Sequence, residues 1–305
     1  MKNISDLIAG IKALKEKHSA VIFAHNYQLP EIQDIADFVG DSLELARQAK
    51  NSSARVIVLC GVYFMAETAK ILNPTKTVLI LDELSGCPLA DCITPTQLEK
   101  LIRENPGVPV VAYVNTSAAV KALSSVCCTS ANAVEVVNAL PEEKIIFIPD
   151  KNLGHFVQQQ TQKKLIIYPG QCFTHAKLTA AEVKKVKELH PRAIFLAHPE
   201  CPPPVQELAE VIASTSQMLK YVRNSPAREF IIGTEMGLLH RLQNENPDKK
   251  FYLASPSLIC PNMKKNNLTK LLASLKNFTY EVKISEDIRQ SAYQAIEKMF
   301  TLTKK

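Results

Sequence analysis

Three cysteines, Cys87, Cys172 and Cys260, recur at nearly equal intervals along the 305-residue chain, and the sequence around them repeats. The apolar runs that lead to them are TVLILDELSGC, KLIIYPGQC and KFYLASPSLIC, and each predicts a β-strand. Three copies of one unit can bring three such residues to a common axis. We therefore expect a threefold scaffold with a metal centre on that axis.

Each copy alternates short β-rich runs with amphipathic helical stretches. In the first copy, the predicted strands lie at 20–28, 54–61 and 77–82, with helices between them. The same order recurs over 108–170 and over 193–255. Such alternation indicates parallel β-α-β units. We predict an α/β fold of three homologous three-layer αβα domains, whose short parallel sheets are arranged around a pseudo-threefold axis.

The domain boundaries are expected beside the cysteines. The first unit spans residues 1–86, the second 87–172 and the third 173–283. The C-terminal stretch, 284–305, is predicted to be a helix that joins the first unit.

Composition and charge exclude several classes of protein. Hydrophobic residues make up 46% and charged residues 22%, the balance of a soluble globular protein. No apolar run reaches the ~18 residues of a membrane span. The N-terminal sequence alternates apolar and charged residues, so we expect no signal peptide and a cytoplasmic location. The net charge of +6 is modest and no basic stripe interleaves with aromatic residues, so neither a membrane nor nucleic acid is an expected partner.

The eight cysteines leave several metal hypotheses open. The thiols of a cytosolic chain stay reduced. The sequence contains no Cys-x-x-Cys pair, which argues against a zinc ribbon and against a thioredoxin-type site. Iron–sulfur clusters usually take four thiolates, so a cluster with three would leave one iron open as a Lewis acid. Zinc with three thiolates and a water is the competing metal. If they bind no metal, the three repeated cysteines are ordinary buried thiols.

Polar side chains follow the first strand of each copy at matching positions. His25, Tyr113 and His198 recur at nearly the same intervals as the three cysteines. Each has a polar partner two positions further on, which lies on the same side of an extended chain. The three pairs are His25–Tyr27, Tyr113–Asn115 and His198–Glu200. Because ligands of open parallel sheets bind beyond the carboxyl ends of the strands, we expect these pairs to face one central cavity and to include the groups that transfer protons.

Hydroxyl groups recur at the predicted helix starts. Ser42, Ser130 and Ser214 occupy the same position in the three copies, to within a few residues. Free backbone N–H groups at helix N-termini bind carboxylate or phosphate, so three such starts at matching positions predict a polyanionic substrate. His175, which lies just after Cys172, is expected near the metal.

The same motifs resemble those of a known family. The chain closely resembles the quinolinate synthases, the iron–sulfur enzymes of de novo NAD biosynthesis, nearly from end to end. The motifs that carry the resemblance are AHNYQ, GDSLELA, AETAKIL, GCPLAD, YVNTSAAVKA, CCTSANA, PDKNLG, HPECPPPV, ASTSQM, GTEMGLLHRL and CPNMK.

The resemblance implies a cofactor and a reaction. Cys87, Cys172 and Cys260 match the ligands of a [4Fe-4S] cluster, whose fourth iron is free to bind substrate. The implied reaction condenses iminoaspartate with dihydroxyacetone phosphate to quinolinate, with release of phosphate and two waters. Both substrates are small anions. A transient encounter with an L-aspartate oxidase, as the source of iminoaspartate, is also expected.

The resemblance also implies individual roles. Glu200 matches a general base, and Tyr27, Tyr113 and Glu200 match residues of the isomerisation, cyclisation and dehydration steps. His175 matches a histidine close to substrate or cluster. The positions that match substrate-binding residues are His25, Ser42, Tyr113, Asn115, Ser130, His198, Glu200, Ser214 and Thr215.

Two other functions compete with this interpretation. One is a zinc-dependent hydro-lyase of the same fold that uses a metal-bound water. The other is a non-catalytic binding protein for a small dicarboxylate. The metal content of the protein separates the first from an iron–sulfur enzyme, and the need for an acid–base residue separates the second.

Overall fold

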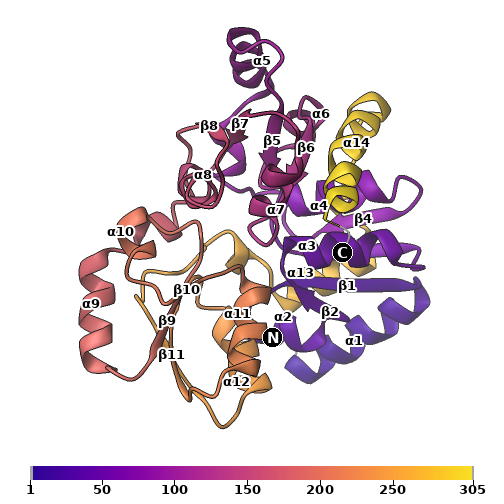
Figure 1. Ribbon diagram of the computed structural model, residues 1–305. Coiled ribbons are helices and arrows are strands. Elements are labelled where there is room, and N and C mark those ends of the chain that lie inside the picture. Colours follow the sequence, from indigo (N-terminus) through magenta and orange to yellow (C-terminus); the bar gives the residue numbers. More distant parts are fainter. Residues whose placement is uncertain (1–2, 304–305) are drawn as a thin grey trace.

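The computed structural model describes residues 3–303 and contains three four-stranded sheets (Figure 1). The strand orders are β2-β1-β3-β4, β6-β5-β7-β8 and β10-β9-β11-β12, so the three units share one topology. Within each sheet, neighbouring strands pair in parallel. The predicted α/β fold of three similar αβα units with short parallel sheets is confirmed.

The strands are short, with two to six residues each. The first sheet contains β1 (Ala20–His25), β2 (Phe38–Gly40), β3 (Val56–Cys60) and β4 (Thr77–Ile80). The second contains β5 (Val110–Tyr113), β6 (Val126–Cys128), β7 (Lys144–Ile148) and β8 (Lys164–Ile167). The third contains β9 (Ile194–Ala197), β10 (Val211–Ile212), β11 (Glu229–Gly233) and β12 (Lys250–Leu253).

Helices connect the strands of each unit. The first unit has α1 (Ile4–Lys17), α2 (Pro30–Ile35), α3 (Ser42–Asn51) and α4 (Tyr63–Leu72). The second has α5 (Pro95–Glu104), α6 (Ala118–Ala122), α7 (Ala133–Ala139) and α8 (Lys151–Gln158). The third has α9 (Ala180–Leu189), α10 (Pro203–Gln206), α11 (Thr215–Asn224) and α12 (Leu238–Glu245). The chain ends with α13 (Leu268–Asn277) and α14 (Glu286–Leu302).

Each sheet has one edge strand that the sequence analysis did not predict. These strands are β2, β6 and β10, and each pairs with the first strand of its unit. They contain two or three residues, which is too few for an alternating pattern to appear in the sequence.

Neighbouring residues of the central strands enter different hydrophobic cores. In β1, Ile22 and Ala24 pack with residues of α1 and α13, whereas Phe23 packs with residues of α3 and α4. Side chains alternate across a strand, so helices on both faces of the sheet bury both sets. Full burial of one such large side chain contributes roughly 1.5–3 kcal/mol. This burial stabilises the three-layer arrangement.

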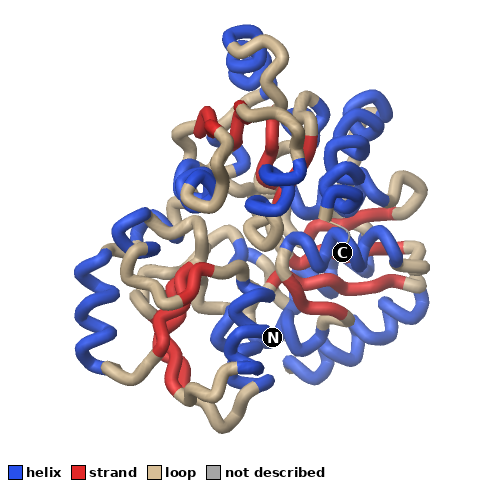
Figure 2. The backbone as a smooth tube through the Cα atoms, viewed as in Figure 1, coloured by secondary structure: helices blue, strands red, loops and turns tan. Residues whose placement is uncertain are grey.

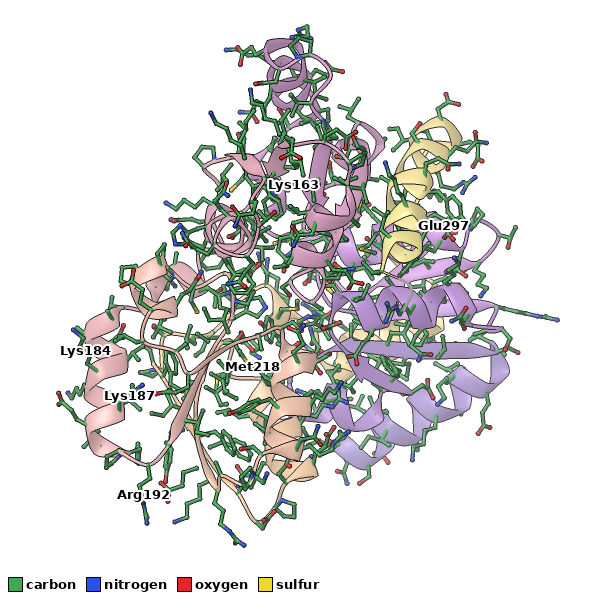
Figure 3. All side chains as sticks on the ribbon, in the orientation of Figure 1. Lys163, Lys184, Lys187, Arg192, Met218 and Glu297 are labelled. Atoms are coloured by element: carbon green, nitrogen blue, oxygen red, sulfur yellow. The ribbon has the colours of Figure 1, made fainter. Side chains whose placement is uncertain are left out.

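The third unit has the same layering. Met218 on α11 is buried and points towards the sheet, whereas Lys184 on α9 and Arg192 project outwards (Figure 3). Separate apolar clusters lie on the two faces of this sheet. The amphipathic patterns of the helices therefore match the faces that they cover.

The C-terminal helix α14 lies between the first two units. It packs against α6 and β6 of the second unit and against α4 of the first, and an ion pair of 2.5 Å joins Glu297 to Lys50. The division at 1–86, 87–172 and 173–283, with 284–305 added to the first unit, stays a prediction. Lys304 and Lys305 of that predicted helix lie outside the described residues. Within residues 3–303, no helix combines the length and the hydropathy of a membrane span.

The carboxyl ends of the strands are followed by loops that meet between the three units. Figure 2 shows these loops in tan, surrounded by the red sheets. Cys87, Cys172 and Cys260 lie in these loops, and the polar pairs begin at the last residue of a strand or directly after it. The topology therefore brings the predicted site residues to the centre of the molecule.

We predict that Gly237→Ala destabilises the contact between the first and third units. A Cβ atom at Gly237, just before α12, would lie 2.6 Å from the carbonyl carbon of Tyr27 and 2.7 Å from its oxygen. Overpacking of this kind typically costs about 1–3 kcal/mol. The expected result is a lower melting temperature, measured by circular dichroism.

Gly10→Ala in α1 is the matched control. Its Cβ would meet only the tip of the Leu272 side chain, at 3.1 Å, which can move aside. Alanine also favours a helix over glycine by about 1 kcal/mol. Equal losses of melting temperature in the two variants would contradict the predicted clash.

Candidate active site

The three cysteine loops have the same local structure. One turn of 3-10 helix begins shortly after each cysteine, as η1 (Ala90–Cys92), η2 (His175–Lys177) and η3 (Met263–Lys265). The carbonyl oxygens of Cys87, Cys172 and Cys260 accept a backbone N–H from that turn, at 3.1, 2.9 and 3.3 Å. The sequence repeat is therefore also a repeat of backbone conformation.

Cys87, Cys172 and Cys260 line one cavity between the three units, and all three are free thiols. Burial raises the pKa of Cys87 to about 12, raises the pKa of Cys172 well above its ordinary value and raises the pKa of Cys260. Backbone N–H groups of the turn that follows each cysteine oppose this rise in pKa. A bound cation would stabilise the three thiolates, since metal ligands must be deprotonated. The donor set fits an iron–sulfur cluster with three cysteine ligands.

A second set of donors also meets the requirements of a metal ion. Ligand atoms of Cys172, His175 and Glu200 lie within 4.8 Å of one another. A thiolate, an imidazole and a carboxylate are all ligands of zinc. This set differs from the zinc site of three thiolates and a water that the sequence left open, because it contains only one of the three repeated cysteines.

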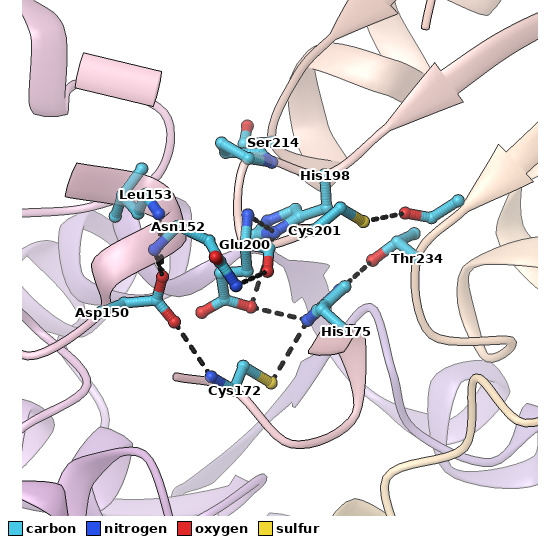
Figure 4. Close-up of polar contacts among 12 residues, drawn as sticks. Asp150, Asn152, Leu153, Cys172, His175, His198, Glu200, Cys201, Ser214 and Thr234 are labelled. Carbon is cyan, nitrogen blue, oxygen red and sulfur yellow. Dashed lines mark hydrogen bonds and ion pairs between the residues drawn. The ribbon is translucent and has the colours of Figure 1, made fainter. Parts of the chain in front are cut away.

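The Glu200 carboxylate forms the electrostatic centre of the cavity (Figure 4). It is buried and lies 2.8 Å from His175 Nδ1 and 3.5 Å from His198 Nδ1. Burial by itself raises the pKa of this carboxyl group, but His175, together with His198 and Tyr113, lowers it to about 2. Glu200 is therefore ionised at neutral pH.

Two other imidazoles of the cavity are neutral. Burial lowers the pKa of His25 and of His198 to about 3, although the charge of Glu200 opposes that change. The His198 ring stacks on His175, with 4.7 Å between the ring centroids. Neutral rings of this kind donate hydrogen bonds without adding charge to the cavity.

Thr234 connects residues of the first and third units. Its hydroxyl group lies 2.5 Å from the Tyr27 hydroxyl and 2.9 Å from His175 Nε2. Together with the contact between His175 and Glu200, this forms a continuous polar chain from Tyr27 to Glu200. Thr234 was not predicted from the sequence, because a single threonine after a strand carries no distinguishing pattern.

The structure places nearly all predicted site residues around the one cavity. They are Cys87, Cys172, Cys260, His25, Tyr27, Ser42, Tyr113, Asn115, Ser130, His175, His198, Glu200 and Thr215. Among the described residues, Glu200 Oε1 and Asn115 Oδ1 have no hydrogen-bond partner. Buried polar atoms are rarely left unpaired, so their presence in the cavity wall fits a polar ligand.

Ser214 lies just outside this lining. Its hydroxyl group accepts the backbone N–H of Gln217, which caps α11, and donates to Asp41 across the boundary with the first unit at 3.3 Å. The neighbouring Thr215 lines the cavity, and its hydroxyl group accepts a hydrogen bond of 2.8 Å from Asn26.

Comparisons with known proteins decide the family. A sequence profile described as "Quinolinate synthetase A protein" matches residues 9–301. The chain is 52% identical over 298 residues to quinolinate synthase 1 of Methanosarcina acetivorans, with 98% of each chain covered. It is 51% identical to the quinolinate synthase of Geotalea uraniireducens, covering 96% of each chain. The chain belongs to the quinolinate synthase family.

Another relative agrees with this assignment. The quinolinate synthase of Caldicellulosiruptor saccharolyticus is 50% identical over 294 residues, covering 96% of this chain and 97% of its own. The resemblance inferred from the sequence motifs is confirmed. Quinolinate synthases are enzymes of NAD biosynthesis, and the family's use of iron and sulfur agrees with three free cysteines in one cavity.

Thr234→Val is expected to destabilise this quinolinate synthase family member. Valine has nearly the shape of threonine but leaves the buried Tyr27 hydroxyl and His175 Nε2 without their common partner. An unpaired buried polar group costs about 1–3 kcal/mol, which urea unfolding followed by circular dichroism measures.

Two further variants make this test specific. Thr234→Ser keeps the hydroxyl group and should restore most of the lost stability. Thr68→Val is the control, because the buried Thr68 hydroxyl only donates to the Phe64 carbonyl within its own helix. A loss at Thr234→Val no greater than that at Thr68→Val would contradict a bridging role.

Proposed function

We propose that this protein condenses iminoaspartate with dihydroxyacetone phosphate to quinolinate, and that phosphate and two waters are released. The observation that carries the proposal is the convergence of three cysteines, each of which follows the last strand of one of the three sheets, on a cavity that also contains the Glu200–His175 pair. Membership of the quinolinate synthase family supports the reaction.

The proposed cofactor is a [4Fe-4S] cluster held by Cys87, Cys172 and Cys260. When bound, it supplies an iron without a protein ligand, which acts as a Lewis acid towards a substrate oxygen. Three repeated thiols in equivalent loops support a cofactor that all three cysteines hold, whereas a metal ion at the Cys172–His175–Glu200 set would leave Cys87 and Cys260 without a role. The measured iron and zinc contents separate the cluster from zinc held by the three thiolates.

The proposed substrate-binding groups surround this centre. They are His25, Ser42, Tyr113, Asn115, Ser130, His198, Glu200, Ser214 and Thr215. Several lie at or near the starts of α3, α7 and α11, where backbone N–H groups favour carboxylate or phosphate. In this proposal, Ser214 acts mainly through the helix start that it caps.

Glu200 is the proposed general base. Its low pKa keeps it ionised, and its unpaired Oε1 is free to accept a proton from substrate. His175 Nδ1, 2.8 Å from Oε2, can share that proton. Burial raises the pKa of Tyr27 and of Tyr113 well above the ordinary value for tyrosine, so both keep their protons and donate hydrogen bonds to substrate oxygens during isomerisation, cyclisation and dehydration.

Burial of the site suits the proposed substrates. The side chains of Tyr27, Tyr113 and Glu200 are all buried. An imine hydrolyses readily in water, so an enclosed cavity protects it. We also propose that the protein acts in the cytoplasm, where an L-aspartate oxidase could deliver iminoaspartate in a transient encounter.

An anaerobic assay of quinolinate formation tests the function directly. The purified protein is given dihydroxyacetone phosphate and enzymatically generated iminoaspartate, and its metal content is measured in parallel. A brown protein with about four irons per chain that forms quinolinate is the expected result. A colourless zinc protein would refute the cluster, and an intact cluster without product would refute the reaction.

Glu200→Gln is predicted to lower turnover by about 10²–10⁴-fold, the usual contribution of a general acid or base, while iron content stays unchanged. The exposed Glu207→Gln in the same unit is the control and should keep full activity. Full activity of Glu200→Gln would exclude its role as the base. A protein that binds substrate but never forms quinolinate would favour the alternative of a dicarboxylate-binding protein.

A further inference from the structure

Two buried carboxylates hold the cysteine loops of the second and third units. The backbone N–H of Cys172 donates to Asp150 Oδ2 at 3.0 Å, and that of Cys260 donates to Glu235 Oε1 at 3.1 Å. Asp150 and Glu235 are both fully buried. They occupy the same position of the repeat, the second after the end of β7 and of β11.

A second contact beside each carboxylate fixes the same loop. The N–H of Lys151 donates to the carbonyl of Gly170 at 2.7 Å. In the third unit, the N–H of Met236 donates to the carbonyl of Leu258 at 2.9 Å. Each of these carbonyls lies just before the cysteine of its loop. Each loop is therefore held at two adjacent points by the segment that follows the neighbouring strand.

The other oxygen of each carboxylate anchors it to the scaffold. Asp150 Oδ1 accepts the N–H groups of Asn152 and Leu153, at 2.9 and 2.8 Å, at the start of α8. Glu235 Oε2 accepts the N–H of Gly237 at 2.7 Å and a hydrogen bond of 3.1 Å from Lys264 Nζ. Burial and the charge of Glu200 raise the pKa of Asp150 to about 8, whereas the three backbone N–H groups that it accepts oppose that rise.

The first unit differs at this position. The backbone contact is present, since the N–H of Tyr63 donates to the carbonyl of Ser85 at 2.8 Å, but the matching residue after β3 is Val62. The Cys87 loop is instead held from the third unit, where Asn262 donates to the carbonyl of Gly86 at 2.8 Å. Two cysteines are thus fixed by carboxylates, and the third is fixed through the loop of Cys260.

We propose that Asp150 and Glu235 are positioning residues that hold the backbones of Cys172 and Cys260 in the conformation that binds the cluster. The inference rests on the proposed function, in which these cysteines are cluster ligands. Both oxygens of each carboxyl group accept hydrogen bonds, so one side chain holds the cysteine backbone and the scaffold together, whereas an amide has a donor in place of one of these acceptors. Groups that orient metal ligands typically change metal affinity by about 10–100-fold when they are removed.

Asp150→Asn separates this role from helix capping. Asparagine caps a helix as well as aspartate does, so its carbonyl oxygen can keep the N–H groups of Asn152 and Leu153. Its NH₂ group then faces the N–H of Cys172, which loses its acceptor. Glu235→Gln replaces one of the two acceptor oxygens by a donor, so the side chain can no longer accept the N–H groups of both Cys260 and Gly237.

The experiment measures iron release from the anaerobic holoprotein to a ferrous chelator. Asp150→Asn and Glu235→Gln should each release iron about 10-fold faster than the wild-type protein. The chelator-stripped variants should melt at a somewhat lower temperature, because one N–H loses its acceptor, but they should stay folded at the temperature of the iron-release assay. The control is Glu210→Gln, because Glu210 also accepts a backbone N–H, that of Phe195 at 2.8 Å, but near the opposite end of its sheet.

The outcomes distinguish this inference from the proposed function. A wild-type protein without iron overturns the proposed cofactor and the inference with it. A wild-type protein with iron, and variants that release it no faster than Glu210→Gln, overturn the inference alone. If one variant fails to fold, as judged from the melting of the stripped protein, the iron release of the other variant tests the inference.

Discussion

Parallel pairing of short strands is the constraint on which the rest of the molecule depends. In each unit, the first strand pairs in parallel with the edge strand and with the third strand of the unit, so the following loops leave from one edge of the sheet. Helices on both faces bury the strands and leave that edge as the place where polar side chains can gather. Three copies of this arrangement turn three polar edges towards one another, and the cavity forms between them.

The cavity combines a repeated scaffold with unlike side chains. The cysteine loops are alike in backbone conformation, but the carboxylate of Glu200 has no acidic counterpart at Tyr27 or Asn115. Burial lowers the pKa of His25 and of His198, so both are neutral, whereas the contact with His175 lowers the pKa of Glu200 and keeps it ionised despite its burial. The repeat thus places equivalent positions around the cavity, and the different side chains at those positions determine its chemistry.

Much of the fold and of the site could be predicted from the sequence. The alternation of apolar runs located three strands in each unit, and the equal spacing of the cysteines implied that the loops converge. The edge strands escaped prediction because two or three residues show no period. Thr234, Asp150 and Glu235 escaped it because their partners lie far away in the chain or in a loop that only the fold brings near.

The sequence by itself determined the α/β class, the threefold repeat, the family and most of the candidate site residues, because periodicity and motif spacing are local properties of a chain. Only the tertiary structure decided which atoms meet. It placed Ser214 on a helix cap and Thr215 in the cavity wall, although the two are neighbours in the sequence. It also decided that the Cys87 loop is held from the third unit. Contacts between distant segments depend on how whole units pack, and no local pattern encodes them.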